Sequence, residues 1–234
     1  MNPLDLYLRV REKEGRLYPD PIAAHLPDIP AHHPLADEWQ ARAASADRLA
    51  RYIARLPQPP RIIEVGCGNG WLSHKLASLR GVHVWGLDRG GSELVQAARL
   101  FHTSNLAFLN ADIFRSPFPP HRFDLIVLAS VIQYFPDLSA LIRTLKDLLT
   151  PGGEIHVLDS PLYNENELAS ARERTHAYYA SLGLPGMAGH YFHHTLSSLQ
   201  PFSPRWLYRP NDWQNRFRRR LGWILPPFAW CCIH

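Results

Sequence analysis

The sequence predicts an α/β domain built on an open, mostly parallel, doubly wound sheet. Short apolar segments alternate with amphipathic ones between residues 62 and 158, which is typical of repeated β-α-β units. A glycine-rich turn follows the first apolar segment, and residues 123–129 form the near-continuous apolar run of a central parallel strand. The chain has 234 residues, of which 46% are hydrophobic and 20% charged, so wholesale disorder is excluded.

The N-terminal residues predict a helix followed by an extended segment. Asn2 and Pro3 form a cap and a first-turn proline, Asp5 adds an early acid, and Gly15 ends the helix. Residues 16–34 contain five prolines and should cross the surface in extended form. This segment is interpreted either as a tether or as a flap over a site.

A long amphipathic helix is expected over residues 35–56, ending at Pro57. Its apolar residues recur at steps of three or four, namely Leu35, Trp39, Ala43, Ala46, Leu49, Ile53 and Leu56. A coiled-coil seam is the alternative, but the steps do not alternate strictly, so a helix packed on a sheet is favoured. Residues 1–57 are therefore predicted to be an extension packing on the core, and residues 58–234 to be the α/β domain.

The remaining elements follow in chain order. Strands are predicted over residues 62–65, 82–87, 106–109, 123–129 and 155–158, with helices over 71–79, 92–101 and 138–149. After these come a helix over 164–181, a loop over 184–204, a strand over 206–208, a helix over 211–220 and a last strand over 228–233.

The most informative segment joins the first predicted strand to the first helix of the sheet. Glu64 precedes glycines at 66, 68 and 70, so the spacing is G-x-G-x-G. A dinucleotide fingerprint would need the third glycine where Trp71 stands. Glycines in such a turn permit positive φ angles and leave the backbone bare for a ligand.

Further features follow this loop in order. Asp88 ends the second predicted strand, where a carboxylate can accept hydrogen bonds from ribose hydroxyls. Asp112 and Ile113 follow the third strand, and a Pro-Gly-Gly turn at 151–153 precedes the fifth. Together these features resemble the class I S-adenosylmethionine-dependent methyltransferases over about residues 62–158.

This resemblance implies a Rossmann-like, mostly parallel seven-stranded sheet with an antiparallel last strand and helices on both faces. It implies S-adenosylmethionine as cofactor and a small-molecule acceptor. It also implies cofactor-binding roles for Glu64, Gly66, Cys67, Gly68, Gly70, Asp88, Asp112, Ile113 and Ala129. Gly66, Gly68 and Gly70 would wrap the methionine part, which Ala129 would face, and Glu64 would orient the loop. Asp88 would hold the ribose, and Asp112 and Ile113 the adenine.

No catalytic residue is assigned from the sequence. The family often has a histidine just beyond the fourth strand, where this chain has Gln133 and Tyr134. Residues 160–204 are predicted to be an acceptor-site insertion, with 184–204 and 16–34 closing over the cofactor's methyl group. His190, His193 and His194 are candidate bases in that lid.

Two other functions remain open. One is a methyltransferase-like binding or scaffold domain without turnover. The other, weaker, is a nicotinamide-dependent oxidoreductase, which Trp71 disfavours. A metal site combining the histidine-rich loop with Cys231, Cys232 or His234 fits known zinc spacings poorly, so none is predicted.

The net charge and the cysteine content limit which partners and which compartment the protein is expected to have. The formal net charge of +4 is too small to argue for nucleic acid. The arginines at 216, 218, 219 and 220 could meet phosphate, but a solvated helix face is favoured. No bilayer-spanning segment is evident, and three cysteines cannot form a disulfide framework. A cytoplasmic protein acting on a small-molecule acceptor is expected, and the sequence carries no clear nucleic-acid or membrane signal.

Overall fold

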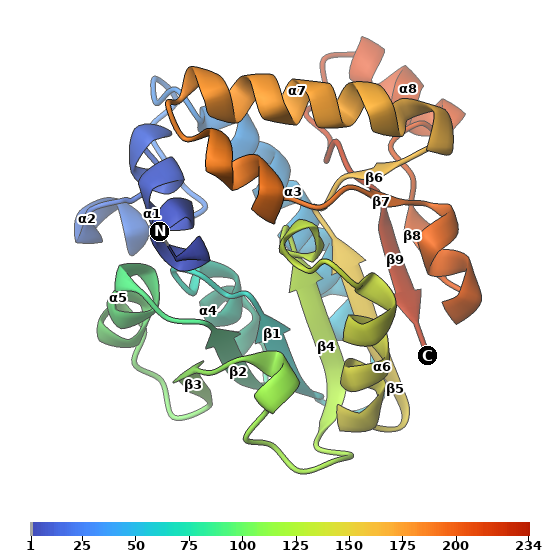
Figure 1. Ribbon diagram of the computed structural model, residues 1–234. Coiled ribbons are helices and arrows are strands. Elements are labelled where there is room, and N and C mark those ends of the chain that lie inside the picture. The colour runs from blue at the N-terminus through green and yellow to red at the C-terminus, as the bar shows by residue number, and fades with distance from the viewer. Residues whose placement is uncertain (1) are drawn as a thin grey trace.

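A seven-stranded sheet in the order β3-β2-β1-β4-β5-β9-β8 runs through the molecule, with helices on both faces (Figure 1). The structure is a computed structural model and describes residues 2–234. The first five strands of the sheet are parallel to one another. The last strand, β9, is antiparallel to both its neighbours, β5 and β8. The predicted sheet, including its antiparallel last strand, is confirmed.

The elements have the following bounds. The large sheet contains β1 (Arg61–Val65), β2 (His83–Asp88), β3 (Leu106–Asn110), β4 (Phe123–Ala129), β5 (Leu149–Leu158), β8 (Arg205–Tyr208) and β9 (Trp230–Ile233). A two-stranded sheet pairs β6 (Leu162–Tyr163) with β7 (His194–Thr195). The α-helices are α1 (Pro3–Lys13), α2 (Asp20–Ala23), α3 (Ala36–Ile53), α4 (Trp71–Ala77), α5 (Ser92–Leu100), α6 (Leu138–Leu148), α7 (Leu168–Ser181) and α8 (Trp213–Arg220).

Alternation along the strands builds two hydrophobic layers. Ile63 of β1 faces the layer covered by α6, whereas its neighbour Ile62 faces the layer covered by α3 and α4. Successive side chains of a strand point to opposite faces, so a strand such as β4, which is apolar apart from Asp124, is buried on both sides. This arrangement brings the carboxyl ends of the parallel strands to one edge, where ligands bind in open α/β sheets.

The N-terminal segment follows the prediction only in part. The predicted first helix is present as α1, whose Asn2 cap accepts a 2.7 Å hydrogen bond from the Leu4 amide. Residues 16–34 are not extended throughout, because they contain α2 and its flanking turns. Pro21 lies in the first turn of α2, where its missing N–H costs no hydrogen bond. Trp39 donates a 2.8 Å bond to Tyr18, so this segment packs on α3.

Residues 184–204 also contain more regular structure than the predicted loop. Short 3₁₀ helices cover Pro185–His190 and Ser197–Phe202, with β7 between them. Strand β5 begins at Leu149, earlier than the predicted fifth strand, and includes the Pro-Gly-Gly turn. None of the helices within residues 2–234 is long and apolar enough to cross a membrane.

Candidate active site

A cavity of about 420 Å³ lies at the carboxyl edge of the sheet, against the glycine loop. Its floor combines the loop after β1, the end of β4, the segment that follows β4 and the end of β5. These residues include Gly66, Cys67, Gly68, Ala129, Ser130, Gln133, Tyr134 and Asp159. Parallel strands deliver all of these segments to the same edge, so the fold alone explains why they meet.

The three loop glycines have different physical roles. All have positive φ angles, of 76° at Gly66, 50° at Gly68 and 75° at Gly70. A Cβ atom on Gly66 would lie 2.3 Å from Val131, and one on Gly70 would lie 2.6 Å from the Phe108 ring. Packing therefore requires glycine at 66 and 70.

At Gly68, by contrast, the backbone faces open space. A Cβ atom there would meet only the Glu93 carboxylate, at 3.9 Å. Gly68 therefore presents bare backbone to the cavity, as a site for a closely bound cofactor requires.

Glu64 is buried at the end of β1 and lines the cavity. The hydroxyl of Ser73, on α4, donates a 2.5 Å hydrogen bond to it. Burial raises the pKa of Glu64 to about 8, and the nearby charge of Asp88 adds to this effect. Its carboxyl group thus ties the end of β1 to the first turn of α4.

Five of the nine predicted cofactor residues line the cavity, namely Glu64, Gly66, Cys67, Gly68 and Ala129. Asp88 lies beside it, with its carboxylate accepting a 2.9 Å bond from the Gly68 amide. Asp112 accepts a 3.0 Å bond from the Phe114 amide, and Ile113 is buried in the core. The roles of Asp88, Asp112 and Ile113 toward ribose and adenine stay predictions.

The cavity's outer walls come mainly from α1 and α7. Helix α7 lies within residues 160–204, the predicted acceptor-site insertion, and α1 lies in the predicted N-terminal extension. Tyr7 and Arg11 contribute from α1, and Arg174 and Tyr179 from α7. Of the predicted lid, only Arg16 from residues 16–34 and Tyr191 from residues 184–204 line the cavity. Leu6 and Val10 of α1 pack with Tyr179 of α7 in one buried apolar cluster, and Lys13 donates a 2.6 Å bond to the Leu182 carbonyl at the end of α7.

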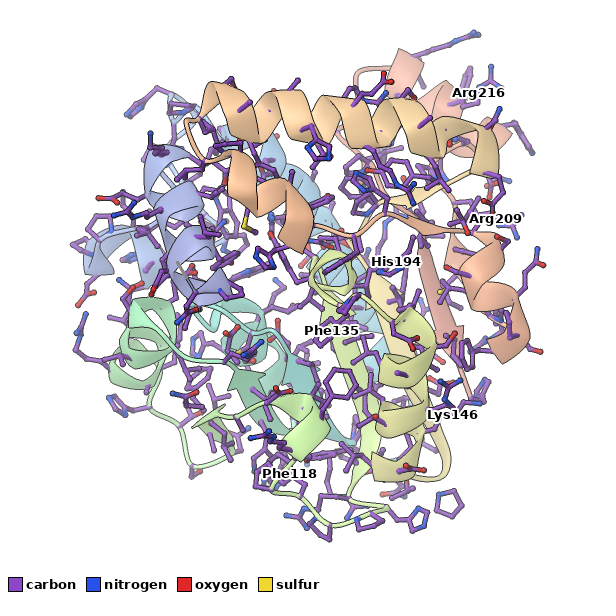
Figure 2. The ribbon with its side chains drawn as sticks, viewed as in Figure 1. Phe118, Phe135, Lys146, His194, Arg209 and Arg216 are labelled. Carbon is purple, nitrogen blue, oxygen red and sulfur yellow. The ribbon has the colours of Figure 1, made fainter. Side chains whose placement is uncertain are left out.

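The candidate histidine bases lie outside the cavity lining. His193 is 2.9 Å from the Thr175 hydroxyl. His194 is buried and donates to the carbonyls of Ile132 and Phe135 at 3.0 and 2.9 Å (Figure 2). Burial lowers the pKa of both rings. The structure therefore gives His194 a packing role and does not place His190, His193 or His194 at the site.

The titratable group that the cavity does contain at the end of β5 is Asp159, which the sequence analysis missed. Its φ angle is 51°, and Ser130 at the end of β4 has a similar φ of 58°. Such left-handed residues other than glycine are uncommon and gather at functional sites. Burial raises the pKa of Asp159 to about 6. An acid closing a parallel strand, the signal that pointed to Asp88, would have identified it.

Two buried polar atoms at the cavity have no hydrogen-bond partner in the described part of the chain: Gln133 Oε1 and Arg11 Nε. The Gln133 amide nitrogen is used, since it donates a 2.7 Å bond to the Ser130 carbonyl. Arg11 forms a 3.0 Å ion pair with Glu93, which links α1 to α5 beside Gly68. Unpartnered buried polar atoms are costly, so both fit a site that a polar ligand completes.

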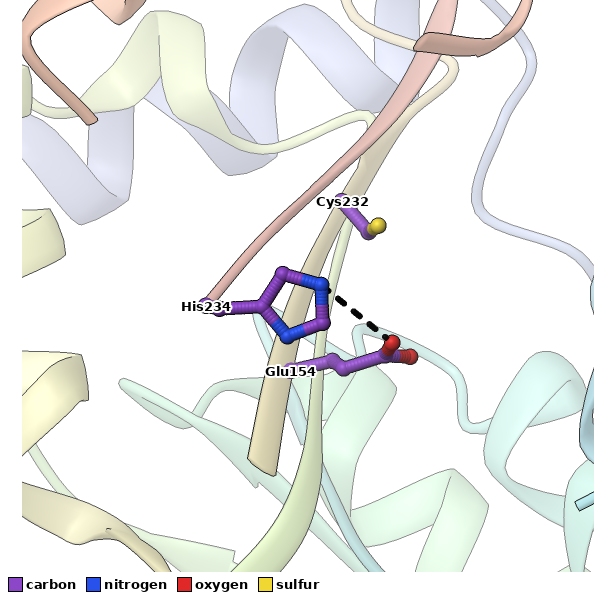
Figure 3. Close-up of side chains that lie close together, drawn as sticks. All are labelled: Glu154, Cys232 and His234. Carbon is purple, nitrogen blue, oxygen red and sulfur yellow. Dashed lines mark ion pairs between the residues drawn. The ribbon is translucent and has the colours of Figure 1, made fainter. Parts of the chain in front are cut away.

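A second polar cluster lies toward the opposite end of the sheet, where Glu154, Cys232 and His234 place their ligand atoms within 4.8 Å of one another (Figure 3). The Glu154 carboxylate is already engaged. Tyr52 donates to it at 2.6 Å, and His156 lies 3.0 Å and Arg205 3.4 Å away. Hydrogen bonds from His156 and Tyr52 lower the pKa of Glu154 to about 2. The Glu154 oxygens thus already have hydrogen-bond and ion-pair partners within the protein.

Comparisons with known proteins agree with this geometry. A model of the methyltransferase domain family matches residues 60–219. A malonyl-[acyl-carrier protein] O-methyltransferase from Erwinia billingiae is 35% identical over 109 residues, 47% of this chain and 42% of the relative. A biotin biosynthesis bifunctional protein from Bordetella avium is 34% identical over 51% of this chain and 26% of its own length. The chain thus spans less than half the length of these two relatives.

A longer match is to a ubiquinone biosynthesis O-methyltransferase from Xanthomonas axonopodis, 29% identical over 71% of this chain and 73% of the relative. Two solved structures share the fold. The YcgJ protein of Bacillus subtilis has a TM-score of 0.57 at 19% identity, over 70% of each chain. An S-adenosylmethionine-dependent methyltransferase of Mesorhizobium loti has a TM-score of 0.54 at 19% identity, over 82% of this chain and 98% of that one.

The oxidoreductase alternative finds no support in these matches, whereas the glycine loop, the strand order and the family match agree. The chain therefore belongs to the class I S-adenosylmethionine-dependent methyltransferase family.

Proposed function

We propose that this chain transfers a methyl group from S-adenosylmethionine to a small molecule bound in the cavity between α1, α7 and the sheet edge. The observation that carries the proposal is the bare Gly68 backbone facing a cavity that also contains Asp159. A scaffold domain without turnover would need the loop only for binding. It would have no use for a partly buried acid held in a left-handed conformation at the cavity floor.

The cofactor side of the cavity fits the proposed ligand. When bound, S-adenosylmethionine supplies a methyl group on a sulfonium centre. Gly68 leaves the backbone accessible, and Gln133 Oε1 is free to accept a hydrogen bond from an ammonium group. We assign the ribose to Asp88, and the adenine to Asp112 and Ile113, on the family resemblance. For the ribose, Asp88 would exchange its bond to the Gly68 amide, or share it with the ligand.

The acceptor side is lined by tyrosines, which favours an acceptor with an aromatic or apolar body. Tyr7 packs edge-on against Tyr134, which in turn packs against Tyr191, with ring centroids 5.4 and 6.0 Å apart. Tyr179 and Tyr163 extend this wall. Large aromatic side chains bury apolar ligand surface while their hydroxyls supply polar contacts. The named relatives include O-methyltransferases of ubiquinone biosynthesis, which is consistent with a small-molecule acceptor.

Asp159 is the proposed general base for a hydroxyl or amine acceptor. With a pKa of about 6 it is deprotonated at neutral pH and can take the proton that the acceptor loses. The neutral thioether leaving group needs no stabilisation by the protein. The remaining contribution of the chain is to align the acceptor with the sulfonium and to exclude water from the cavity. Helices α1 and α7, which form the cavity walls, would serve both purposes.

Calorimetric titration with S-adenosylmethionine and with NAD tests the cofactor assignment. Binding of the first and not the second is expected, and the reverse would contradict the proposal. Turnover is tested by release of S-adenosylhomocysteine with a panel of phenols, hydroxy acids and amines. Tight cofactor binding without product from any member of the panel would favour the scaffold alternative.

A further inference from the structure

The surface around α8 combines exposed apolar side chains with unpaired positive charge. Five large apolar residues, Trp213, Phe217, Leu221, Trp223 and Ile224, form what we call the docking face. Trp213, Phe217 and Leu221 follow helical spacing, and their exposed fractions are 75%, 58% and 61%. Such side chains normally face a core, so an apolar helix face left in water indicates a binding surface.

The charge beside the docking face is strongly positive. Arg216, Arg218 and Arg220 form no ion pair with any acidic side chain of residues 2–234, and all are exposed. Arg218 lies 5.9 Å above the Trp223 ring, and the Arg219 guanidinium donates to the Pro226 carbonyl at 2.9 Å. In Figure 2, Arg216 and Arg209 project outward on the same side of the molecule. Neighbouring like charges repel, so a negatively charged partner would relieve this arrangement.

We propose that α8 and residues 221–225 dock onto the surface of an anionic lipid bilayer. A short helix with Trp, Phe and Leu on one face and arginines around it matches the composition of helices that lie in the membrane interface. Tryptophan is favoured at the depth of lipid headgroups, and arginines there gain from the negative surface potential. Such a helix lies in the plane of the interface, with its apolar side chains among the headgroups and its arginines beside them, and does not span the bilayer.

Two other occupants fit the same surface less well. A second copy of the chain would bring the four arginines of each α8 together, which is unfavourable without intervening acids. RNA would use the arginines and could stack on the tryptophans, but it offers nothing for the exposed aliphatic side chains of Leu221 and Ile224. A bilayer satisfies the aromatic, aliphatic and cationic residues at once.

A groove of about 970 Å³ begins beside α8 and leads toward the candidate active site. Arg209, Asp212 and Phe228 line it near α8, and Tyr163, Arg174 and Tyr191 line both this groove and the cavity at the glycine loop. An acceptor with an apolar tail could therefore pass from a bilayer to the cavity. This last step rests on the proposed function, whereas bilayer binding itself does not.

Co-sedimentation of the full chain with vesicles tests the proposal. One set contains about 30% phosphatidylglycerol in phosphatidylcholine and the other phosphatidylcholine alone. The protein should bind the anionic vesicles at least roughly fivefold more tightly, and raising the salt to about 0.5 M should weaken this preference. Equal sedimentation with both sets, or with neither, would overturn the proposal.

Two pairs of matched variants locate the contact. Trp213→Ser with Phe217→Ser should reduce vesicle affinity by about tenfold or more, whereas Val95→Ser, on an exposed position of α5, should leave it unchanged. Arg216→Gln with Arg220→Gln should remove the anionic preference, whereas Arg80→Gln with Arg143→Gln removes equal charge elsewhere and should not.

Measurements independent of lipid complete the test. S-adenosylmethionine affinity and the far-ultraviolet circular dichroism spectrum should match between all variants and the original chain, which separates bilayer docking from cofactor binding and folding. Preferential binding of single-stranded RNA over anionic vesicles would overturn the proposal. So would a concentration-dependent dimer that Trp213→Ser abolishes while vesicle binding stays unchanged.

Discussion

The two ends of the sheet hold buried or partly buried carboxylates whose pKa values are shifted in opposite directions. At the carboxyl edge, burial raises the pKa of Glu64 to about 8 and that of Asp159 to about 6. Near the other end, hydrogen bonds lower the pKa of Glu154 to about 2. Glu154 accepts bonds from Tyr52 and lies against Arg205 and His156, whereas the edge acids have few partners. A carboxylate whose oxygens are hydrogen-bonded and ion-paired stabilises the fold. A desolvated carboxylate with few partners, beside a cavity, is available for chemistry.

The largest expected effect concerns Asp159. Asp159→Asn should reduce the methyl-transfer rate by roughly 10²–10⁴-fold if it is the base, and asparagine tolerates the left-handed backbone. The original enzyme should lose activity as pH falls through about 6, because protonation removes the base, and the variant should lack this inflection. His193→Gln is the control and should keep the inflection. If His193→Gln removes the inflection instead, the histidine is the base.

The second prediction concerns Gly68. Gly68→Val should weaken S-adenosylmethionine binding at least about a hundredfold, since a branched side chain would fill space reserved for ligand. Gly152→Val is the matched control near the opposite end of the sheet, because Gly152 has φ 81° and no atom near its Cβ position. It carries similar backbone strain without touching the cavity. Equal calorimetric affinity of the two variants would mean that the loop does not hold the cofactor.

The third prediction concerns Asp88. Asp88→Ala should weaken cofactor binding roughly ten- to a hundredfold, because it removes a charged acceptor of hydrogen bonds from the ribose hydroxyls. Asp124→Ala is its counterpart at the start of β4, where the carboxylate pairs with Arg61 at 2.9 Å. That variant should lower the melting temperature without altering calorimetric affinity. A folded Asp88→Ala protein with unchanged affinity would contradict the ribose assignment.

The smallest expected effects are on the free energy of unfolding, and they test whether the acids at the two ends of the sheet differ as described. At pH 7.5, Glu154→Gln should lower the free energy of unfolding by about 1–3 kcal/mol. The lowered pKa of Glu154 gives stability that is present above its unfolded pKa and is lost as pH falls toward about 2. Asp159→Asn should instead raise the free energy of unfolding by about 1–3 kcal/mol, because the folded state disfavours the charged Asp159.

Urea titration checks both signs, since each variant removes one negative charge. Asp159 itself makes the original chain lose stability as pH rises through about 6. Destabilisation by both substitutions would remove the distinction between the two ends of the sheet.

Local sequence patterns were sufficient to predict the sheet and the glycine loop. Strand β4 is apolar apart from Asp124 near its start, which predicted a central position, and the spacing of Gly66, Gly68 and Gly70 distinguished the loop from a dinucleotide fingerprint. These features are local, because strand period and glycine geometry depend on neighbouring residues in the chain.

The tertiary structure was needed to identify the side chains from outside the sheet that complete the site. Tyr7 on α1 and Tyr179 on α7 are 172 positions apart in numbering, yet both line the cavity, and nothing in either helix's periodicity predicts that contact. The same holds for His194, buried against backbone carbonyls, and for Trp213, left exposed on α8. Periodicity defines the faces of a helix, but burial depends on which distant element packs there, and that is set by the whole fold.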